Sequence, residues 1–443
     1  MRNTHGMAED CRVMRWGIAA SHFISIVRSL MNPLHVLREN GRLVAFGFFM
    51  CFCSSVGQTF FISLFNGELR HVFNLSHGDI GAMYAAGTIA SAAIFMFAGR
   101  LVDRVRLPIM VAIVFGGLAL SALGMGLVAS AAVLPFVFFG LRLFGQGLAS
   151  HTGMTAMARS FNATRGRAIS LASLGFSAGE ALLPTLTVAL LAIFAWQSIW
   201  LGVAAITVLA VPLGLYLLKG ERPRKDEADE TTGPQASIRH WRLGAVLRHA
   251  TFWLRLPTFI APAFIATGLF FHQVHLAEEK GWPLPLIAGS FTAFALSSIV
   301  TTLFAGPLVD RLSARQLWPW VLLPMALSCV VLASSASVWV APAFMILIGM
   351  TTGLYSISGT AMWPELYGTR HLGAIKAFVQ SVMVLASGVA PVALGVLIDR
   401  DVSMNLISLA CAAWCVFAAI LAVVAMRRDQ STAGSGTASS PSK

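Results

Sequence analysis

The chain has 443 residues, of which 57% are hydrophobic and only 11% are charged, whereas a soluble domain averages about 25% charged residues. Uncharged apolar runs long enough to cross a bilayer, about 18 residues or more, recur along the chain. This composition excludes a soluble globular protein. It predicts an all-α integral membrane protein, because backbone groups in hydrocarbon must be hydrogen-bonded within helices.

The apolar runs predict twelve transmembrane helices in two groups of six, separated by one long hydrophilic stretch. The expected spans are residues 43–65, 80–101, 108–129, 132–157, 168–194, 198–218, 252–276, 285–308, 317–333, 337–363, 372–398 and 403–426. The predicted organisation is a cytoplasmic N-terminal segment (1–41), a six-helix half (42–218), a cytoplasmic linker (219–250), a second six-helix half (251–428) and a disordered tail (429–443).

The N-terminal segment is ambiguous. Residues 16–31 are fairly apolar but contain His22 and Arg28 and are short for a span. They are interpreted either as an interfacial helix or as a product of an upstream start codon, since Met31 begins a stretch that suits an ordinary N-terminus. We favour the second interpretation.

The distribution of Lys and Arg predicts the orientation. With the N-terminus in the cytoplasm, 27 of the 31 Lys and Arg residues flank the cytoplasmic side, and only Arg70, Lys280 and Arg400 flank the outer side. Positive charge concentrates on cytoplasmic loops, where it also faces anionic lipid. We therefore expect both termini in the cytoplasm, and the net charge of +12 requires no nucleic-acid partner.

A repeat relates the two halves. Residues 98–104 read Ala-Gly-Arg-Leu-Val-Asp-Arg, and residues 305–311 repeat six of these seven positions, 207 residues later. Pro184 and Pro391 match at the same offset. Six spans return the chain to the same side, so the halves run in parallel. Such repeats place a substrate site between the halves near the bilayer midplane.

Twelve spans in two halves, a central loop and Gly-x-Leu-x-Asp-Arg after spans two and eight resemble the major facilitator superfamily of secondary transporters. The resemblance covers about residues 42–428. It implies that the two motif copies latch the halves together on the cytoplasmic side in the outward-facing state. The latch residues are Gly99, Asp103, Arg104, Gly306, Asp310 and Arg311. The glycines are expected to let a neighbouring helix approach closely, and the aspartates to cap an adjacent helix N-terminus.

Two ionisable residues lie deep in predicted spans. Arg142 is about 15 Å into span four and Glu180 about 18 Å into span five, counting about 1.5 Å per residue in a core of about 30 Å. Charge at that depth costs about 2.5–3.5 kcal/mol or more when unpaired, so it marks function by default. We predict that Glu180 is a proton site coupled electrostatically to Arg142. The alternative is a structural ion pair that braces the two helices.

The surrounding motifs support this choice in part. Leu141 to Gly147 resembles the fourth-span motif in which the family places a cavity-facing arginine, which implies proton transfer or substrate anchoring. Gly175 to Pro184 resembles the fifth-span motif of drug–proton antiporters, but Glu180 stands where that motif has proline. Further cavity candidates are polar residues in the expected lining helices. They are Gln58, Thr59, His272, Gln273, Tyr355, Ser356 and Gln380.

Several other chemistries have no support in the sequence. Gly-Lys does not occur, so there is no phosphate-binding loop for ATP, and His-Glu-x-x-His is absent. All cysteines except Cys11 fall in apolar segments without zinc-ligand spacing. We therefore expect no cofactor, no metal site and no enzymatic activity.

The sequence thus predicts a secondary active transporter in the plasma (inner) membrane that works by alternating access with proton coupling. One deep arginine and little aromatic crowding favour a small organic anion such as a monocarboxylate. The sequence loosely resembles bacterial oxalate–formate and monocarboxylate carriers. The alternatives are efflux of drugs or metabolites by proton antiport and a non-transporting membrane sensor. The expected partners are a small-molecule substrate, protons and membrane lipid, and the expected state is a monomer.

Overall fold

The computed structural model describes residues 33–99, 101–161, 164–219, 241–368 and 371–435, and it describes side chains throughout these ranges except at 33–39, 103 and 430–435. The ambiguous segment 16–31 lies outside the described residues. All regular elements in the described part of the chain are helical. This agrees with the fold class that the composition predicts.

The first half contains six spans built from several helical pieces. Its elements are α2 (Pro33–Ser54), η1 (Ser55–Gly57), α3 (Thr59–Ile62), η2 (Ser63–Phe65), α4 (Asn66–Phe73), α5 (His77–Ala98), α6 (Leu101–Arg104), α7 (Leu107–Gly126), η3 (Ala131–Val133), α8 (Leu134–Gly140), η4 (Leu141–Ala149), α9 (Ser150–Ser160), α10 (Arg165–Leu191) and α11 (Trp196–Leu217). The second half contains α12 (Leu243–Leu247), α13 (Ala250–Phe271), α14 (Gln273–Lys280), α15 (Leu284–Leu312), α16 (Ala314–Leu317), η5 (Trp318–Trp320), α17 (Leu323–Ser334), α18 (Val340–Tyr367), α19 (Leu372–Ile398) and α20 (Met404–Ser435).

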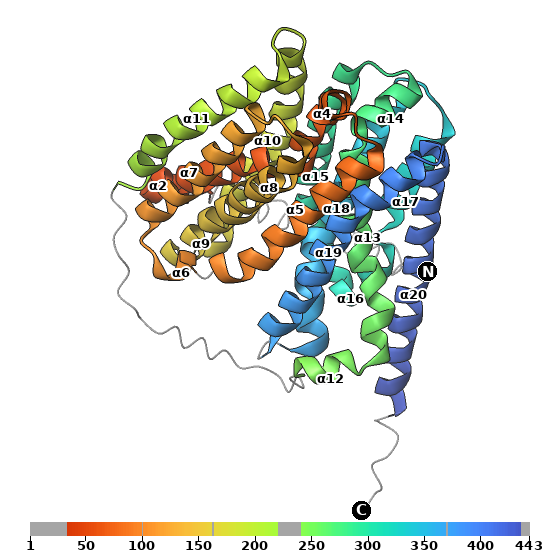
Figure 1. The fold of residues 1–443 in the computed structure, drawn as a ribbon. Helices are drawn as coiled ribbons and strands as arrows, with labels where there is room; N and C mark the ends of the chain where they lie inside the picture. Colours follow the sequence, from red (N-terminus) through yellow and green to blue (C-terminus); the bar gives the residue numbers. More distant parts are fainter. Residues whose placement is uncertain (1–32, 100, 162–163, 220–240, 369–370, 436–443) are drawn as a thin grey trace, which may run out of the picture.

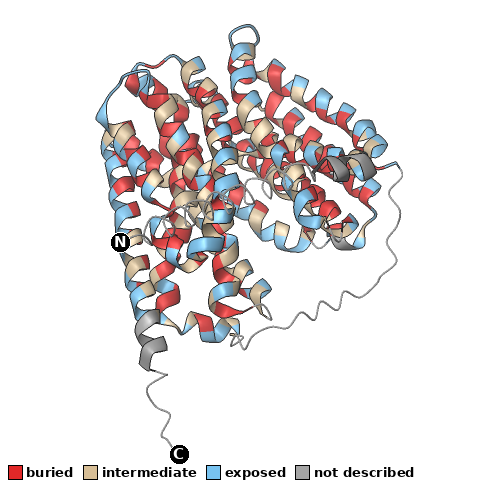
Figure 2. Cartoon of the chain, turned by 180° about the vertical axis from the view of Figure 1, so that it is seen from behind, coloured by how far each residue is buried: buried red, intermediate tan, exposed pale blue. Residues whose placement is uncertain are grey.

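The number of spans matches the prediction. Among the described residues, eleven helical segments are long and apolar enough to cross a membrane, and a pair bent by 48°, residues 40–57 and 59–73, makes the twelfth. Large apolar side chains such as Phe136 and Phe304 are more than 70% exposed. Figure 2 shows exposed residues along the outward faces of the helices and buried ones between them. Such apolar exposure on helix surfaces suits contact with lipid.

Local sequence explains where several helices begin and end. Ser76 and Asp79 form a reciprocal capping box at the start of α5. Proline stands in the first turn of α7, α15 and α17, where its missing N–H costs no hydrogen bond. Asn74 and Gly281 end α4 and α14 with positive φ angles of 52° and 66°, which asparagine and glycine tolerate.

The two halves meet at one face and diverge at the other (Figure 1). We call the face where α11 ends and α12 begins the linker face. The hydrogen bonds between the halves that the described residues make lie toward the opposite face, which we call the closed face. There α5 packs along α19, and α10 packs on α15. A Cβ at Gly81 would lie 2.7 Å from the Pro391 carbonyl oxygen, so glycine permits this close approach.

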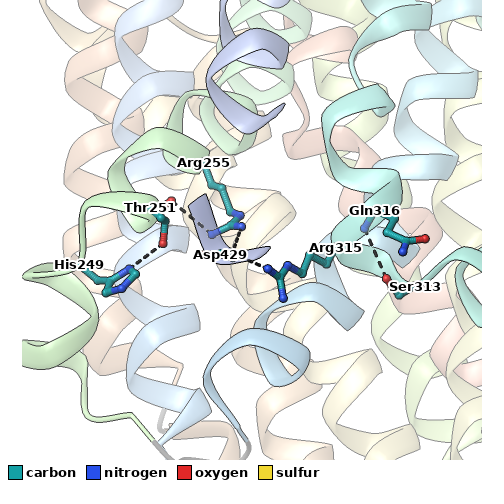
Figure 3. Close-up of polar contacts among 7 residues, drawn as sticks. All are labelled: His249, Thr251, Arg255, Ser313, Arg315, Gln316 and Asp429. Carbon is teal, nitrogen blue, oxygen red and sulfur yellow. Dashed lines mark hydrogen bonds and ion pairs between the residues drawn. The ribbon is translucent and has the colours of Figure 1, made fainter. Parts of the chain in front are cut away.

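One expectation near the linker face is wrong. Residues 429–435 are helical as the last part of α20, so the tail is ordered further than expected. Arg255 lies near the start of α13 and is 2% exposed. It pairs with Asp429 of α20, which also lies 3.4 Å from Arg315 of α16 (Figure 3). A buried guanidinium needs such a partner, so Asp429 extends the packed structure beyond the predicted span.

Candidate functional site

The first span is interrupted where it faces the fourth. After η1, Gln58 adopts extended backbone angles (φ −84°, ψ 152°) before α3 begins. Gly57 packs on Gly145 of η4 so closely that a Cβ on Gly145 would lie 2.7 Å from the Gly57 Cα. Irregular backbone at membrane depth is tolerated where protein or a cavity satisfies its polar groups, and broken helices often form substrate sites.

Arg142 lies beside this interruption. It belongs to η4, a π-helical segment from Leu141 to Ala149, and π-helical turns frequently occur at functional sites. The Arg142 side chain is 6% exposed. Its Nη1 donates to the Gly57 carbonyl oxygen and to the Thr59 Oγ1, both at 3.4 Å. The wider coil of η4 and the close contact between Gly57 and Gly145 together place the Arg142 guanidinium against the broken first span.

The charge of Arg142 is poorly compensated. Its buried Nε has no hydrogen-bond partner, and no carboxylate pairs with it among the described residues. Its two hydrogen bonds are long and go to neutral oxygens, whereas an arginine fork bonds best to a carboxylate or phosphate. Among the described residues, the Arg142 guanidinium therefore bonds to neutral acceptors alone.

Tyr84 also lies against Arg142, and it was not predicted from the sequence. The guanidinium carbon lies 5.4 Å from the centre of the Tyr84 ring, within range of a cation–π interaction. The Tyr84 hydroxyl is 2.7 Å from the Thr59 Oγ1, and its ring packs at 4.7 Å on Phe271 of the other half. Nothing in the apolar pattern of α5 distinguishes Tyr84 from a core residue.

Gln58 is available to a ligand in this arrangement. Its side chain is half-buried at the break in span one and makes no hydrogen bond to the described residues. A primary amide carries both donors and an acceptor. Gln58 and Arg142 therefore stand on facing elements with unused hydrogen-bonding capacity.

Glu180 does not pair with Arg142 in this conformation, so the bracing ion pair is not formed. Its half-buried side chain has no ion-pair partner among the described residues. Its neighbours in α10 contact both halves. Gly179 packs on Ser55 in span one, and the Ala181 carbonyl oxygen accepts from Thr292 of α15 at 2.9 Å. Glu180 thus lies where α10 joins the two halves.

Two predicted cavity residues instead close the interface between the halves. The fully buried Gln273 donates through Nε2 to the Phe60 carbonyl oxygen and the Ser63 Oγ, both at 2.8 Å. His272 is 3% exposed and its Nε2 lies 2.8 Å from the Pro391 carbonyl oxygen, so that nitrogen carries the proton. Both residues follow α13, which ends at Phe271, rather than lying within a continuous span.

The remaining candidates lie in the second half, away from Arg142. The Tyr355 hydroxyl donates to the Phe259 carbonyl oxygen at 3.2 Å, Ser356 bonds within its own helix, and Gln380 is exposed on α19. Sequence analysis expected little aromatic crowding, but Phe259 stacks on Trp318 at 4.0 Å and on Trp363 at 4.4 Å. These rings form a packed core of the second half. They come from segments that are far apart in the sequence, so the sequence does not show that they meet.

The latch residues whose side chains the structure describes lie at the linker face. In this conformation no described atom lies within 4 Å of a Cβ on Gly306, and the nearest atoms to a Cβ on Gly99 belong to Phe95, so the close helix approach expected in the outward-facing state stays a prediction. Arg104, Asp310 and Arg311 are exposed. The side chain of Asp103 lies outside the described part of the structure. Glu365 accepts from the Ala314 N–H at the start of α16 at 3.1 Å, and the helix capping expected of Asp103 and Asp310 stays a prediction.

Comparisons with known proteins agree with this architecture. The family profile of the Major Facilitator Superfamily matches residues 47–289 and 266–441. A bacterial homolog of the human lysosomal transporter Spinster, inward-facing and unoccupied, is structurally similar with a TM-score of 0.67 and 13% identity over 88% of this chain and 97% of that one. The nucleoside transporter NupG gives 0.64 and 14% over 87% and 98%. No curated protein matches the sequence. At these identities the structural similarity concerns the fold.

Proposed function

The chain belongs to the Major Facilitator Superfamily and is a secondary transporter rather than an enzyme, and on that premise we propose that it carries a small organic anion bound by Arg142. The main support is that the buried guanidinium of Arg142 lies beside a broken span and has no anionic partner among the described residues. A carboxylate of the substrate would supply the missing acceptor, and Gln58 would bond to its polar groups. A monocarboxylate is the simplest such substrate.

The orientation follows from the excess of Lys and Arg at the linker face, which belongs in the cytoplasm of a plasma (inner) membrane protein. Both termini are then cytoplasmic, and the described conformation is open inward. In the outward-facing state the two motif copies around Asp103 and Asp310 would approach and latch the halves together. One chain is the proposed transporting unit, since Arg142, Gln58 and Glu180 all belong to it.

Protons are the proposed coupling ion, and Glu180 is the proposed proton site. Its neighbour Ala181 bonds to Thr292 of the second half, and its half-buried side chain has no ion-pair partner among the described residues, which supports this role. Binding of an anion at Arg142 would change the local field and so the proton affinity of a nearby carboxyl. The second candidate is antiport of a cationic drug or metabolite, which the lack of an ion-pair partner for Glu180 among the described residues equally favours.

Transport by purified protein in liposomes that contain a pH dye separates these functions. Small organic anions, then lipophilic cations, are added outside one at a time. Anion-dependent acidification of the lumen supports symport, whereas cation-dependent alkalinisation supports antiport. Arg142→Gln should abolish the anion response, and the matched control Arg167→Gln, at an exposed position, should retain it. No response to any substrate would contradict the proposed coupling.

The role of Glu180 needs a different comparison. Glu180→Gln keeps the shape of the side chain but cannot lose or gain a proton near neutral pH. We expect it to abolish uptake driven by a pH gradient while substrate exchange at equal pH continues. Equal loss of both activities would assign Glu180 a structural role instead.

A further inference from the structure

A second cluster of titratable residues lies at the closed face, away from Arg142 and Glu180. The ring of His77, the first residue of α5, lies 4.4 Å from the ring of His275 in α14 and 5.7 Å from that of His272. His77 belongs to the first half and the other two to the second. Three imidazoles thus meet across the interface that must part when the transporter opens on this side.

Charged groups surround these rings on the elements packed against them. Arg70 of α4 lines the same small cavity as His77, His272 and His275. His275 lies 3.6 Å from Glu279 on its own helix. The charge of Glu278, in the same turn, favours protonation of His275. Asp399, at the end of α19, accepts the N–H groups of His77 at 2.9 Å and Gly78 at 2.7 Å.

The cavity beside the three imidazole rings is too small for an organic substrate but can hold water. Its volume open to a water-sized sphere is about 10 Å³, room for about one water molecule. The cavity is lined by backbone and side chains of both halves, including Asn66, whose Oδ1 is buried without a hydrogen-bond partner. This space suits water and protons rather than an organic substrate.

We propose that His77, His272 and His275 form a proton-binding site that opens the closed face when they are protonated. One imidazolium in the cluster adds a positive charge beside Arg70 and the two other rings, and a second places like charges on opposite sides of the interface. Opposite charges at Asp399 and Glu279 are already engaged with the α5 N-terminus and with the Met404 N–H of α20. Separation of the halves relieves the repulsion and hydrates the rings.

The direction of the pH effect follows from the proton affinity in each state. Burial lowers the pKa of His275 in the closed conformation, and Glu279 and Glu278 offset this only in part. When the face opens, a hydrated histidine returns to its usual pKa of about 6.5. The open state therefore binds protons more tightly, so a fall in pH below about 6.5 shifts the population toward it.

Asp399 does not account for such a shift. Burial raises the pKa of its carboxyl, but the hydrogen bonds from Gly78, Ser76 and His77 outweigh this and hold the pKa below its usual value. The carboxylate therefore stays ionised between pH 8.0 and 5.5, the range in which the histidines respond.

The opening of the closed face at low pH can be measured directly as a distance between the two halves. Spin labels at Val72→Cys of α4 and Trp339→Cys beside α18, both exposed, report the separation of the halves by pulsed electron resonance in lipid nanodiscs without substrate. The native cysteines are replaced by alanine. We expect the population with long distances to rise at least threefold between pH 8.0 and 5.5. A population that does not change with pH would overturn the proposal.

Histidine variants identify the groups responsible. His77→Gln and His275→Gln should each reduce the pH-dependent change, and the double variant, which keeps only His272, should reduce it further. His71→Gln, an exposed histidine on α4, is the matched control and should respond as the parent does. A double variant that still responds fully would refute the assignment. If the double variant does not fold, the two single variants decide the question.

This inference rests on the proposed alternating-access transport but fails separately from it. A protein that opens with acid yet moves no protons with substrate keeps the histidine site and loses the proposed coupling. A protein that couples transport to protons without any acid-dependent opening keeps the proposed function and loses the histidine site.

Discussion

Asp399 joins the two halves at the closed face, and its loss should shift the balance between inward-open and outward-open states. Its carboxylate accepts two N–H groups from the first turn of α5. Asp399→Asn keeps one acceptor oxygen and removes the charge. One charge-assisted hydrogen bond contributes about 1.5 kcal/mol at the low end of its range, suited to an exposed residue. The interaction of a charge with a helix N-terminus adds about 0.5 kcal/mol.

The sum of about 2 kcal/mol corresponds to about a 30-fold change in the ratio of the two states. In the open state the same groups are hydrated, so the loss falls on the closed interface alone. The spin-label pair across the closed face measures the ratio at pH 7.5. Asp401→Asn, two residues away with an exposed side chain, makes the same change of charge and should leave the ratio within a factor of two.

The outcome distinguishes a specific contact from a general effect of charge. Equal shifts in Asp399→Asn and Asp401→Asn would mean that surface charge, rather than the cap on α5, sets the balance. No shift in Asp399→Asn would refute the energetic argument, because packing of α5 on α19 would then hold the closed face without the carboxylate.

Other predictions concern the site and the linker face. Gly145→Ala places a Cβ 2.7 Å from the backbone of span one and should abolish transport in protein that still folds, whereas Gly116→Ala, with nothing within 4 Å, should be neutral in the liposome assay. Arg142→Lys keeps the charge but loses the fork, and we expect KM for an anionic substrate to rise about tenfold. Asp429→Asn leaves the buried Arg255 without a counter-charge, at a cost of about 3 kcal/mol, and should lower the melting temperature by several degrees, seen by intrinsic fluorescence.

The sequence could predict most of the fold because the bilayer imposes a simple rule on it. Apolar runs locate twelve spans, since a helix must fill about 30 Å of hydrocarbon, and the repeat around Asp103 and Asp310 reveals the two halves. The deep position of Arg142 could be found in the same way, because charge is rare in such segments. These inferences need only composition, length and period along one helix.

Partners of the side chains could not be predicted in this way. Helix counting places Arg142 and Glu180 at similar depths, but it does not give the rotation of each helix about its axis. In the folded chain Arg142 instead meets Tyr84 and the broken backbone at Gly57. The bend in span one has no proline to mark it, and depends on the contact between Gly57 and Gly145.

The sequence by itself determined the number of spans, the two-fold repeat and the scarcity of buried charge, because each is a property of a single helix in lipid. The tertiary structure alone decided which face is closed, that three histidines meet there, and that Asp429 balances Arg255. Lipid and protein interior are equally apolar, so hydrophobicity does not indicate which side of a helix packs on another. That choice depends on small residues and hydrogen bonds between segments that are far apart in the chain.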